Sequence, residues 1–185
     1  LDEIRQFGSH ISYPPRCSGN ESDAEILERS EAAHGMSGST LLLTMPTEIH
    51  RLADIVDLSA DAVGTGFDPW AGTLSIESVL SKYHSAKVIS NDFNPASPAQ
   101  FHLDALRSTT YEQAEAYAQE QGSSIGAIVT SPHWRLLDMA MPLAIQRAAS
   151  VVCFHVGAQF FDSAPARRRQ FWQKLSDENR RVDVQ

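Results

Sequence analysis

Short apolar runs alternate along this chain with longer segments in which apolar residues recur every three or four positions. The clearest runs, Lys87–Ser90, Ala127–Thr130 and Val151–Val156, have the length and composition of buried strands. A further apolar start falls near Gly66 and Phe67. Alternation of this kind predicts an α/β fold, with a doubly wound, mostly parallel sheet, helices on both faces and right-handed crossovers.

Six segments have helical character, and the first begins with a capping signal. Ser22 can cap a helix in which Glu25 lies three residues on, and that helix would end near Gly35. In the second, four residues share one helical stripe: Ile49, Leu52, Ile55 and Val56. The other predicted helices span Ser75–Tyr83, Thr110–Gln121, Leu137–Ala148 and Pro165–Leu175. Two short strands are predicted at Gln100–Leu103 and Val182–Val184.

Length and composition favour one globular domain with a substantial core. The chain has 185 residues, of which 42% are hydrophobic and 21% charged, as is ordinary for a water-soluble globular protein. Residues 1–39 are predicted to form a polar lead-in with a short helix, and residues 40–185 to form the folded domain.

Several classes of protein are disfavoured. No apolar run approaches the roughly 18 residues that a membrane helix needs, and no leader resembles a signal peptide. Cys17 and Cys153 are far apart and lack zinc-like spacing with histidine, so we expect an intracellular protein, cytoplasmic or nuclear, without a structural metal. The net charge of −8 argues against strong non-specific binding to nucleic acid. Two basic clusters, Arg167–Arg169 and Arg180–Arg181, either decorate a helix face or contact phosphate.

Acidic residues stand at the ends of three predicted strands. Asp68 ends the first and is followed by Gly72, where a tight turn into a helix would let backbone and cofactor approach closely. Asp92 ends the next strand, at the position where nucleotide-binding folds hold ribose hydroxyls with an acid. Asp104 follows a short apolar stretch and could hold an adenine amine. The alternative for Asp92 is that it only caps the turn at Asn94.

The segment Ser131-Pro-His-Trp134 follows the best strand candidate and suits a flat, polar ring. The Ser131 hydroxyl and the Pro132 carbonyl could accept the two hydrogens of an exocyclic amine, which favours the tetrahedral nitrogen that attacks. Trp134 could stack on the ring. The alternative is a strand-ending turn with a core tryptophan. His155, inside the last apolar run, is interpreted as a core or pocket-edge histidine.

This series of motifs resembles the amino-methyltransferases that use S-adenosylmethionine, which methylate adenine N6 or cytosine N4. It consists of Asp68-Pro-Trp-Ala-Gly-Thr73, Asn91-Asp92, His102-Leu-Asp104 and Thr130-Ser-Pro-His-Trp134, and it covers about residues 40–160. In that family an Asp-Pro-Phe-Ala-Gly-Thr-Gly-type loop holds the cofactor, and an Asn/Asp/Ser-Pro-Pro-aromatic tetrapeptide holds the target amine. Thr44-Met-Pro46 also resembles a Thr-Pro segment of some adenine-specific members.

The resemblance implies a Rossmann-like class I methyltransferase fold and a role for eight residues. Asp68, Ala71 and Gly72 would line the methionine end of S-adenosylmethionine. Asp92 would hold the ribose hydroxyls and Asp104 the adenine amine. The catalytic residues of the target pocket would be Ser131, Pro132 and Trp134. The implied reaction is direct methyl transfer to an exocyclic amine of a base, with adenine favoured, DNA more than RNA as partner, and no membrane.

Three departures keep other functions open. Leu74 stands where the family has its second glycine, and His133 replaces the second proline of the tetrapeptide. The chain also ends where such a fold would still need its last strands, so either it is a fragment or a partner supplies target recognition. The alternatives are therefore a methyltransferase-like binding or scaffolding module without activity, or an enzyme that methylates a protein or small-molecule amine.

Overall fold

The computed structural model describes residues 18–20, 22, 24–25, 44–133, 136–148, 150–156 and 173. The chain divides into two compact units, Leu1–His155 and Val156–Gln185, and the features below belong to the first. The boundary expected after residue 39, most of the helix predicted at Pro165–Leu175 and the strand predicted at Val182–Val184 lie outside the described residues.

The core of the first unit is a parallel sheet, as the sequence predicts. Its strands are β1 (Thr65–Asp68), β2 (Lys87–Ser90), β3 (Ile125–Thr130) and β4 (Val151–Phe154), in the order β2-β1-β3-β4. All three pairings are parallel. The strand predicted at Gln100–Leu103 is reduced to one parallel bridge between Asn91 and Phe101. The prediction of an α/β, Rossmann-like sheet is confirmed.

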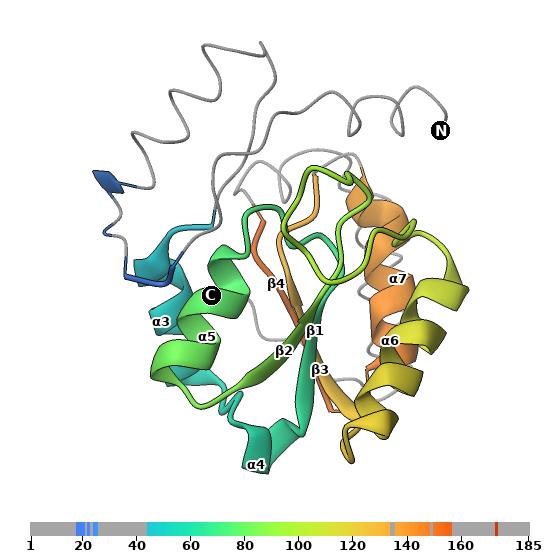
Figure 1. Cartoon of the computed structure of the whole chain (residues 1–185), viewed down its shortest axis with the longest axis horizontal. Coiled ribbons are helices and arrows are strands. Elements are labelled where there is room, and N and C mark those ends of the chain that lie inside the picture. The colour runs from blue at the N-terminus through green and yellow to red at the C-terminus, as the bar shows by residue number, and fades with distance from the viewer. Residues whose placement is uncertain are drawn as a thin grey trace, which may run out of the picture. The chain divides into compact units, whose positions relative to one another are not determined.

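Helices cover both faces of this sheet (Figure 1). On one side lie α3 (Pro46–Ile55) and α5 (Ser75–Tyr83), and on the other α6 (Ser108–Glu120) and α7 (Leu137–Arg147). A four-residue helix that was not predicted, α4 (Ala60–Val63), leads into β1.

Near the amino end, the predicted capping pair is present: the Ser22 amide donates to Glu25 Oε2 at 2.7 Å.

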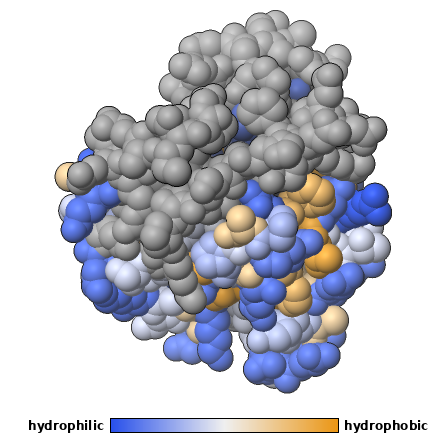
Figure 2. Space-filling view, turned by 45° about the horizontal axis from the view of Figure 1, so that its top comes forward, coloured by the Kyte–Doolittle hydropathy of each residue, from blue (hydrophilic) through white to orange (hydrophobic). Residues whose placement is uncertain are grey.

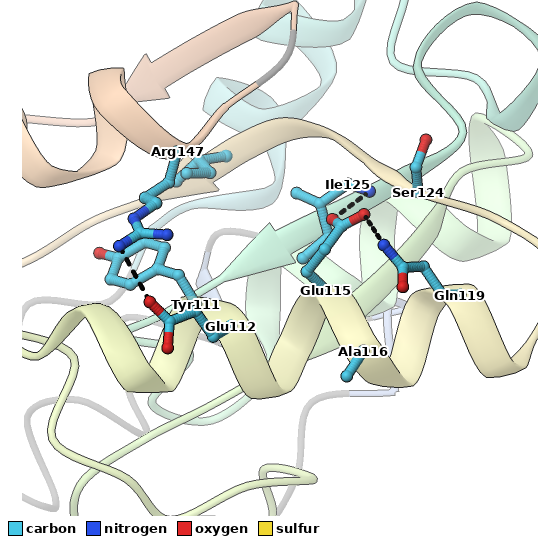
Figure 3. Close-up of a pocket in the computed structure, with 9 residues that line it drawn as sticks. Tyr111, Glu112, Glu115, Ala116, Gln119, Ser124, Ile125 and Arg147 are labelled. Atoms are coloured by element: carbon cyan, nitrogen blue, oxygen red, sulfur yellow. Dashed lines mark hydrogen bonds and ion pairs between the residues drawn. The ribbon is translucent and has the colours of Figure 1, made fainter.

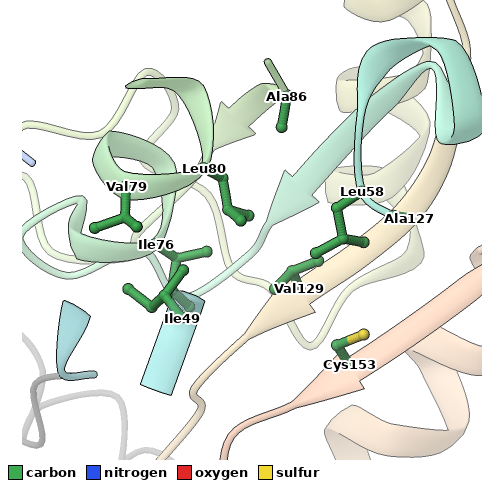
Figure 4. Packing of buried hydrophobic residues seen from close by; sticks show 9 residues of the cluster. All are labelled: Ile49, Leu58, Ile76, Val79, Leu80, Ala86, Ala127, Val129 and Cys153. Carbon is green, nitrogen blue, oxygen red and sulfur yellow. The ribbon is translucent and has the colours of Figure 1, made fainter. Parts of the chain in front are cut away.

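Two hydrophobic clusters hold the layers together. Figure 4 shows the cluster beneath α3 and α5, in which Ile49 and Leu80 pack with Ala127, Val129 and Cys153 of the sheet. The opposite cluster has Phe67, Ile89 and Ile128 from three strands against Tyr111 and Ala144. Because β1 and β3 are buried along their whole length, their carboxyl ends lie inside the protein.

The predicted stripe on α3 is wrong at one position. Ile49 is buried and Leu52 and Val56 pack against the same cluster, but Ile55 is 52% exposed. Ala53 packs there instead. The residues 49, 52, 53 and 56 follow the spacing of an α-helix closely, whereas Ile55 lies beside that stripe at the end of the helix.

A bulge at Gly126 lets β3 contribute side chains to both hydrophobic clusters. The register steps from Thr65 opposite Ile125 to Gly66 opposite Ala127, so Gly126 is an extra residue. This step turns Ile125 and Ile128 toward α6 and Ala127 toward α5. A Cβ at Gly126 would overlap the carbonyl group of Val63, so only glycine fits under the end of α4.

Gly126→Ala is therefore expected to lower the free energy of unfolding by about 1–3 kcal/mol, because the backbone of α4 must move away from β3. Gly66→Ala on the neighbouring strand is the matched control. Its Cβ would make ordinary contacts of 3.4 Å with the Lys87 carbonyl and 3.5 Å with Val88 Cγ2. We expect that control to change stability by less than about 1 kcal/mol. Chemical denaturation of both variants measures the difference, and equal stabilities would contradict the close approach.

Candidate functional site

The candidate site lies at the carboxyl edge of the sheet, where the direction of strand addition reverses. From β1 the chain moves outward to β2, and from β3 it moves outward the other way to β4. Parallel sheets bind ligands in the crevice between the two strands at which this reversal occurs. Here those strands are β1 and β3, which end at Asp68 and Thr130.

Asp68 is buried, with only 1% of its surface exposed. Its Oδ1 accepts hydrogen bonds from the Thr130 hydroxyl at 2.6 Å and from the Trp70 amide at 3.2 Å. Its Oδ2 has no hydrogen-bond partner among the described residues. Burial raises the pKa of Asp68 to about 7, and the negative charges of Asp92 and Glu77 act in the same direction.

The turn after β1 has the backbone form that two glycines would favour, although only one is present. Gly72 has a φ of 53° and Leu74, which precedes α5, has a φ of 66°. A left-handed conformation costs a branched residue such as leucine about 1–2 kcal/mol. The Leu74 side chain is 1% exposed and packs with Ala71 and Ala99, and burial of a leucine offsets that cost. The departure from the family motif is thus accommodated by packing.

One of the two remaining predicted acids, Asp92, is joined to this turn by a hydrogen bond. Asp92 Oδ2 accepts from the Gly72 amide at 2.9 Å, which ties the end of β2 to the turn after β1. Its Oδ1 accepts from the Asn94 amide at 2.9 Å, so the capping role considered for Asp92 is present as well. Asp104 is bonded locally, to the Leu106 amide at 3.1 Å and to Arg107 Nε at 3.4 Å.

Asn91 holds three loops in place, a role that its position in the sequence did not reveal. It is completely buried. Its side-chain amide donates to the carbonyls of Pro69 at 3.0 Å and Leu103 at 3.1 Å, and its Oδ1 accepts from the Leu103 amide at 2.9 Å. A buried, fully bonded amide of this kind fixes the loops of Asp68, Asp92 and Asp104 relative to one another.

The predicted target loop begins directly beside Asp68. Ser131 follows Thr130, whose hydroxyl bonds to Asp68, and Pro132 is buried. The His133 carbonyl accepts from the Leu136 amide at 2.8 Å. Trp134 lies outside the described residues, so its predicted stacking role stays a prediction.

His155 approaches Ser131, and Glu48 in turn approaches His155, although neither residue was predicted to belong to the site. The Ser131 hydroxyl lies 3.3 Å from His155 Nδ1, and His155 Nε2 lies 3.3 Å from Glu48 Oε2. His155 was expected to be a core or pocket-edge residue, and its side chain is 38% exposed at that edge. The register offers a signal for this neighbour, because Thr130 pairs with Phe154, so the next residues of both strands are also adjacent. Glu48 comes from α3, and no local pattern indicates that contact.

A separate cavity of about 400 Å³ lies away from this edge, between α6, α7 and β3 (Figure 3). Its carboxylates are already bonded: Glu112 to Arg147 at 3.1 Å, and Glu115 to the Ile125 amide at 2.9 Å. Tyr111 also lines it, and burial raises the pKa of this phenol. None of the residues predicted at the carboxyl edge lines this cavity, neither the acids Asp68, Asp92 and Asp104 nor Ser131.

The exposed surface adds little that would identify a ligand. In the view of Figure 2 the described residues are mostly hydrophilic, with hydrophobic residues gathered in one part. The described residues contain no group of three His, Cys, Asp or Glu side chains placed to hold a metal ion. None of the described helices has the length and apolar character needed to cross a membrane.

Comparison with known proteins adds no assignment: no family model, curated protein or solved structure matches this chain significantly. The methyltransferase resemblance therefore rests on the sequence motifs.

Replacement of Asp68 by asparagine is expected to change how stability depends on pH. Asp68 has a pKa of about 7 in the folded protein and an ordinary value of 3.8, so only the folded chain retains its proton between these values. Its contribution to stability is complete below pH 3.8 and is lost as the pH rises through 7, at a cost of about 4 kcal/mol. Asparagine keeps an acceptor for Thr130 and carries no charge.

We therefore expect the stability of Asp68→Asn relative to the wild type to rise by about 4 kcal/mol between pH 4 and pH 7.5. Urea denaturation at several pH values measures this difference. Asp61→Asn, at an exposed acid of α4, is the control and should show no such trend. A pH-independent difference for Asp68→Asn would show that burial does not oppose ionisation of this carboxyl.

Proposed function

We propose that this protein binds S-adenosylmethionine at the carboxyl edge of its sheet and transfers the methyl group to an exocyclic amine. A nucleic-acid base is the favoured acceptor, adenine before cytosine and DNA before RNA. The observation that carries the proposal is Asp68, a buried carboxyl at the switch point with one oxygen that has no hydrogen-bond partner among the described residues. A buried acceptor without a partner is costly, and a cationic group of a ligand would satisfy it.

The residues present fit the methionine end of this cofactor. S-Adenosylmethionine carries an ammonium group and supplies a methyl group bonded to a positively charged sulfur. Asp68 would accept a hydrogen bond from the ammonium, and the backbone at Ala71 and Gly72 would line that end of the molecule. The hydrogen bond between Gly72 and Asp92 supports this role, because it holds the turn in position before the ligand arrives.

Asp92 and Asp104 would hold the nucleoside part of the cofactor. Asp92, whose carboxylate oxygens accept from the amides of Gly72 and Asn94, would also accept from the ribose hydroxyls. Asp104 would accept from the adenine amine. The Asn91 bonds to Pro69 and Leu103 support a common binding surface, since they join the loops that carry Asp68 and Asp104.

The target amine would lie against Ser131 and Pro132. Their oxygens would accept its two hydrogens and leave the nitrogen lone pair directed at the methyl carbon. The short bond between Thr130 and Asp68 supports the proximity of the two subsites, because Ser131 follows Thr130 in the chain. In duplex DNA the base would first have to leave the stack.

Two observations favour other readings of the same site. Leu74 has a left-handed backbone conformation and a side chain buried between loops, which favours a binding module that no longer transfers methyl groups. The net charge of −8 favours an amine of a protein or small molecule over DNA, unless a partner contributes positive charge. Binding and transfer assays separate these readings from the main proposal.

Calorimetric titration with S-adenosylmethionine is expected to give micromolar affinity for the wild type. Because binding of the ammonium requires ionised Asp68, whose pKa is about 7, affinity should rise about tenfold between pH 5.5 and pH 7. Asp68→Asn should bind at least tenfold more weakly at pH 7.5 and lose that pH dependence. Asp61→Asn should behave as the wild type does. A folded wild-type protein without affinity would overturn the proposal.

Ser131→Ala is expected to retain cofactor affinity and to lose most methyl transfer, by about 100-fold, because one acceptor for the target amine is removed. Transfer of a labelled methyl group to adenine-containing single-stranded DNA measures this, with cytosine DNA, RNA and protein acceptors assayed in parallel. Ser81→Ala, at an exposed serine of α5, is the matched control. Undiminished transfer by Ser131→Ala would rule out the amine-pocket role. Transfer only to the protein acceptor would show that the substrate is a protein amine and not a nucleic-acid base.

A further inference from the structure

We infer that Ser131, His155 and Glu48 form a proton relay that accepts the hydrogen released from the methylated amine. The relay is defined by two contacts of 3.3 Å, from the Ser131 hydroxyl to His155 Nδ1 and from His155 Nε2 to Glu48 Oε2. The inference rests on the proposed methyl transfer for the identity of the proton donor.

The Glu48 carboxylate fixes the direction of the relay. A carboxylate only accepts hydrogen bonds, so a neutral His155 must carry its proton on Nε2 and present the Nδ1 lone pair to Ser131. The Ser131 hydroxyl then donates to Nδ1, and its own lone pairs remain for the target amine. In the opposite tautomer Nε2 would face Glu48 with a lone pair, and two acceptors would repel.

Glu48 is held in position by the start of α3. Its Oε2 also accepts from the Met45 amide at 3.0 Å, so the oxygen that orients His155 caps the helix. On the other side, the His155 amide donates to the Thr130 carbonyl at 2.9 Å, next to Ser131. Backbone hydrogen bonds thus fix the main chain of His155 beside Ser131 and the carboxylate that faces its Nε2.

The chemistry balances without another reactant. The target nitrogen forms a bond to the methyl carbon as the carbon–sulfur bond breaks, and the electron pair of that bond stays on sulfur. The nitrogen then releases one proton to the Ser131 oxygen while the serine proton passes to His155 Nδ1. The imidazolium is stabilised by Glu48. Because the His155 side chain is 38% exposed, it can return that proton to water.

The hydrogen-bond arrangement can be tested without the cofactor. Nitrogen NMR of the full chain at pH 8 is expected to show His155 as the Nε2–H tautomer. Glu48→Gln keeps an oxygen for this proton and should retain the tautomer, whereas Glu48→Ala should give a mixture. An Nδ1–H tautomer in the wild type, or an unchanged tautomer in Glu48→Ala, would overturn the relay.

The proton-accepting role is tested by rescue. His155→Ala should bind S-adenosylmethionine as the wild type does, lower kcat about 100-fold and regain transfer when imidazole is added. His84→Ala, at a half-buried histidine after α5, is the matched control and should keep full transfer. Full transfer by His155→Ala would refute the acceptor role. A wild type that binds no cofactor would instead refute the proposed function, while the NMR result still decides the relay.

Discussion

The burial of β1 is the constraint on which the candidate site depends. This strand lies between β2 and β3 and is buried at all four positions, so its last residue must end inside the protein. That residue is an acid. One oxygen of Asp68 bonds to Thr130 across the switch point, and the other has no partner in the described part of the chain. Desolvation raises its pKa, so its charge depends on what binds beside it.

The loops around Asp68 are organised before any ligand is present. Asn91 bonds to the backbone of two of them, and Asp92 bonds to the turn that carries Gly72. Such preorganisation reduces the ordering that binding would otherwise require. Leu74 fits the same picture, because its packing between Ala71 and Ala99 offsets the cost of its backbone conformation. Hydrogen bonds and packing therefore connect the loops on the side proposed for the cofactor, whereas His155 and Glu48 are partly exposed on the side proposed for the target.

The sequence by itself determined the architecture. Runs of buried residues alternating with helical stripes predict a parallel sheet, and the bounds of α5 and β2 agree with the prediction. This succeeds because burial on both faces of a strand, or on one face of a helix, leaves a periodic trace in the residues themselves. Parallel strands also bring their carboxyl ends to one edge, so Asp68, Asp92 and Ser131 could be assigned to one site.

Only the tertiary structure decided how these side chains are paired. Three features join residues that are far apart in the chain: the bulge at Gly126, the hydrogen bonds of the Asn91 side chain and the contact of Glu48 with His155. No periodic pattern of residues in the sequence indicates them. Ile55 shows the same limit, because its exposure depends on how α3 is rotated on the sheet. The pKa of Asp68 likewise follows from burial and from its partners. Contacts between elements, more than patterns within them, set the chemistry of this edge.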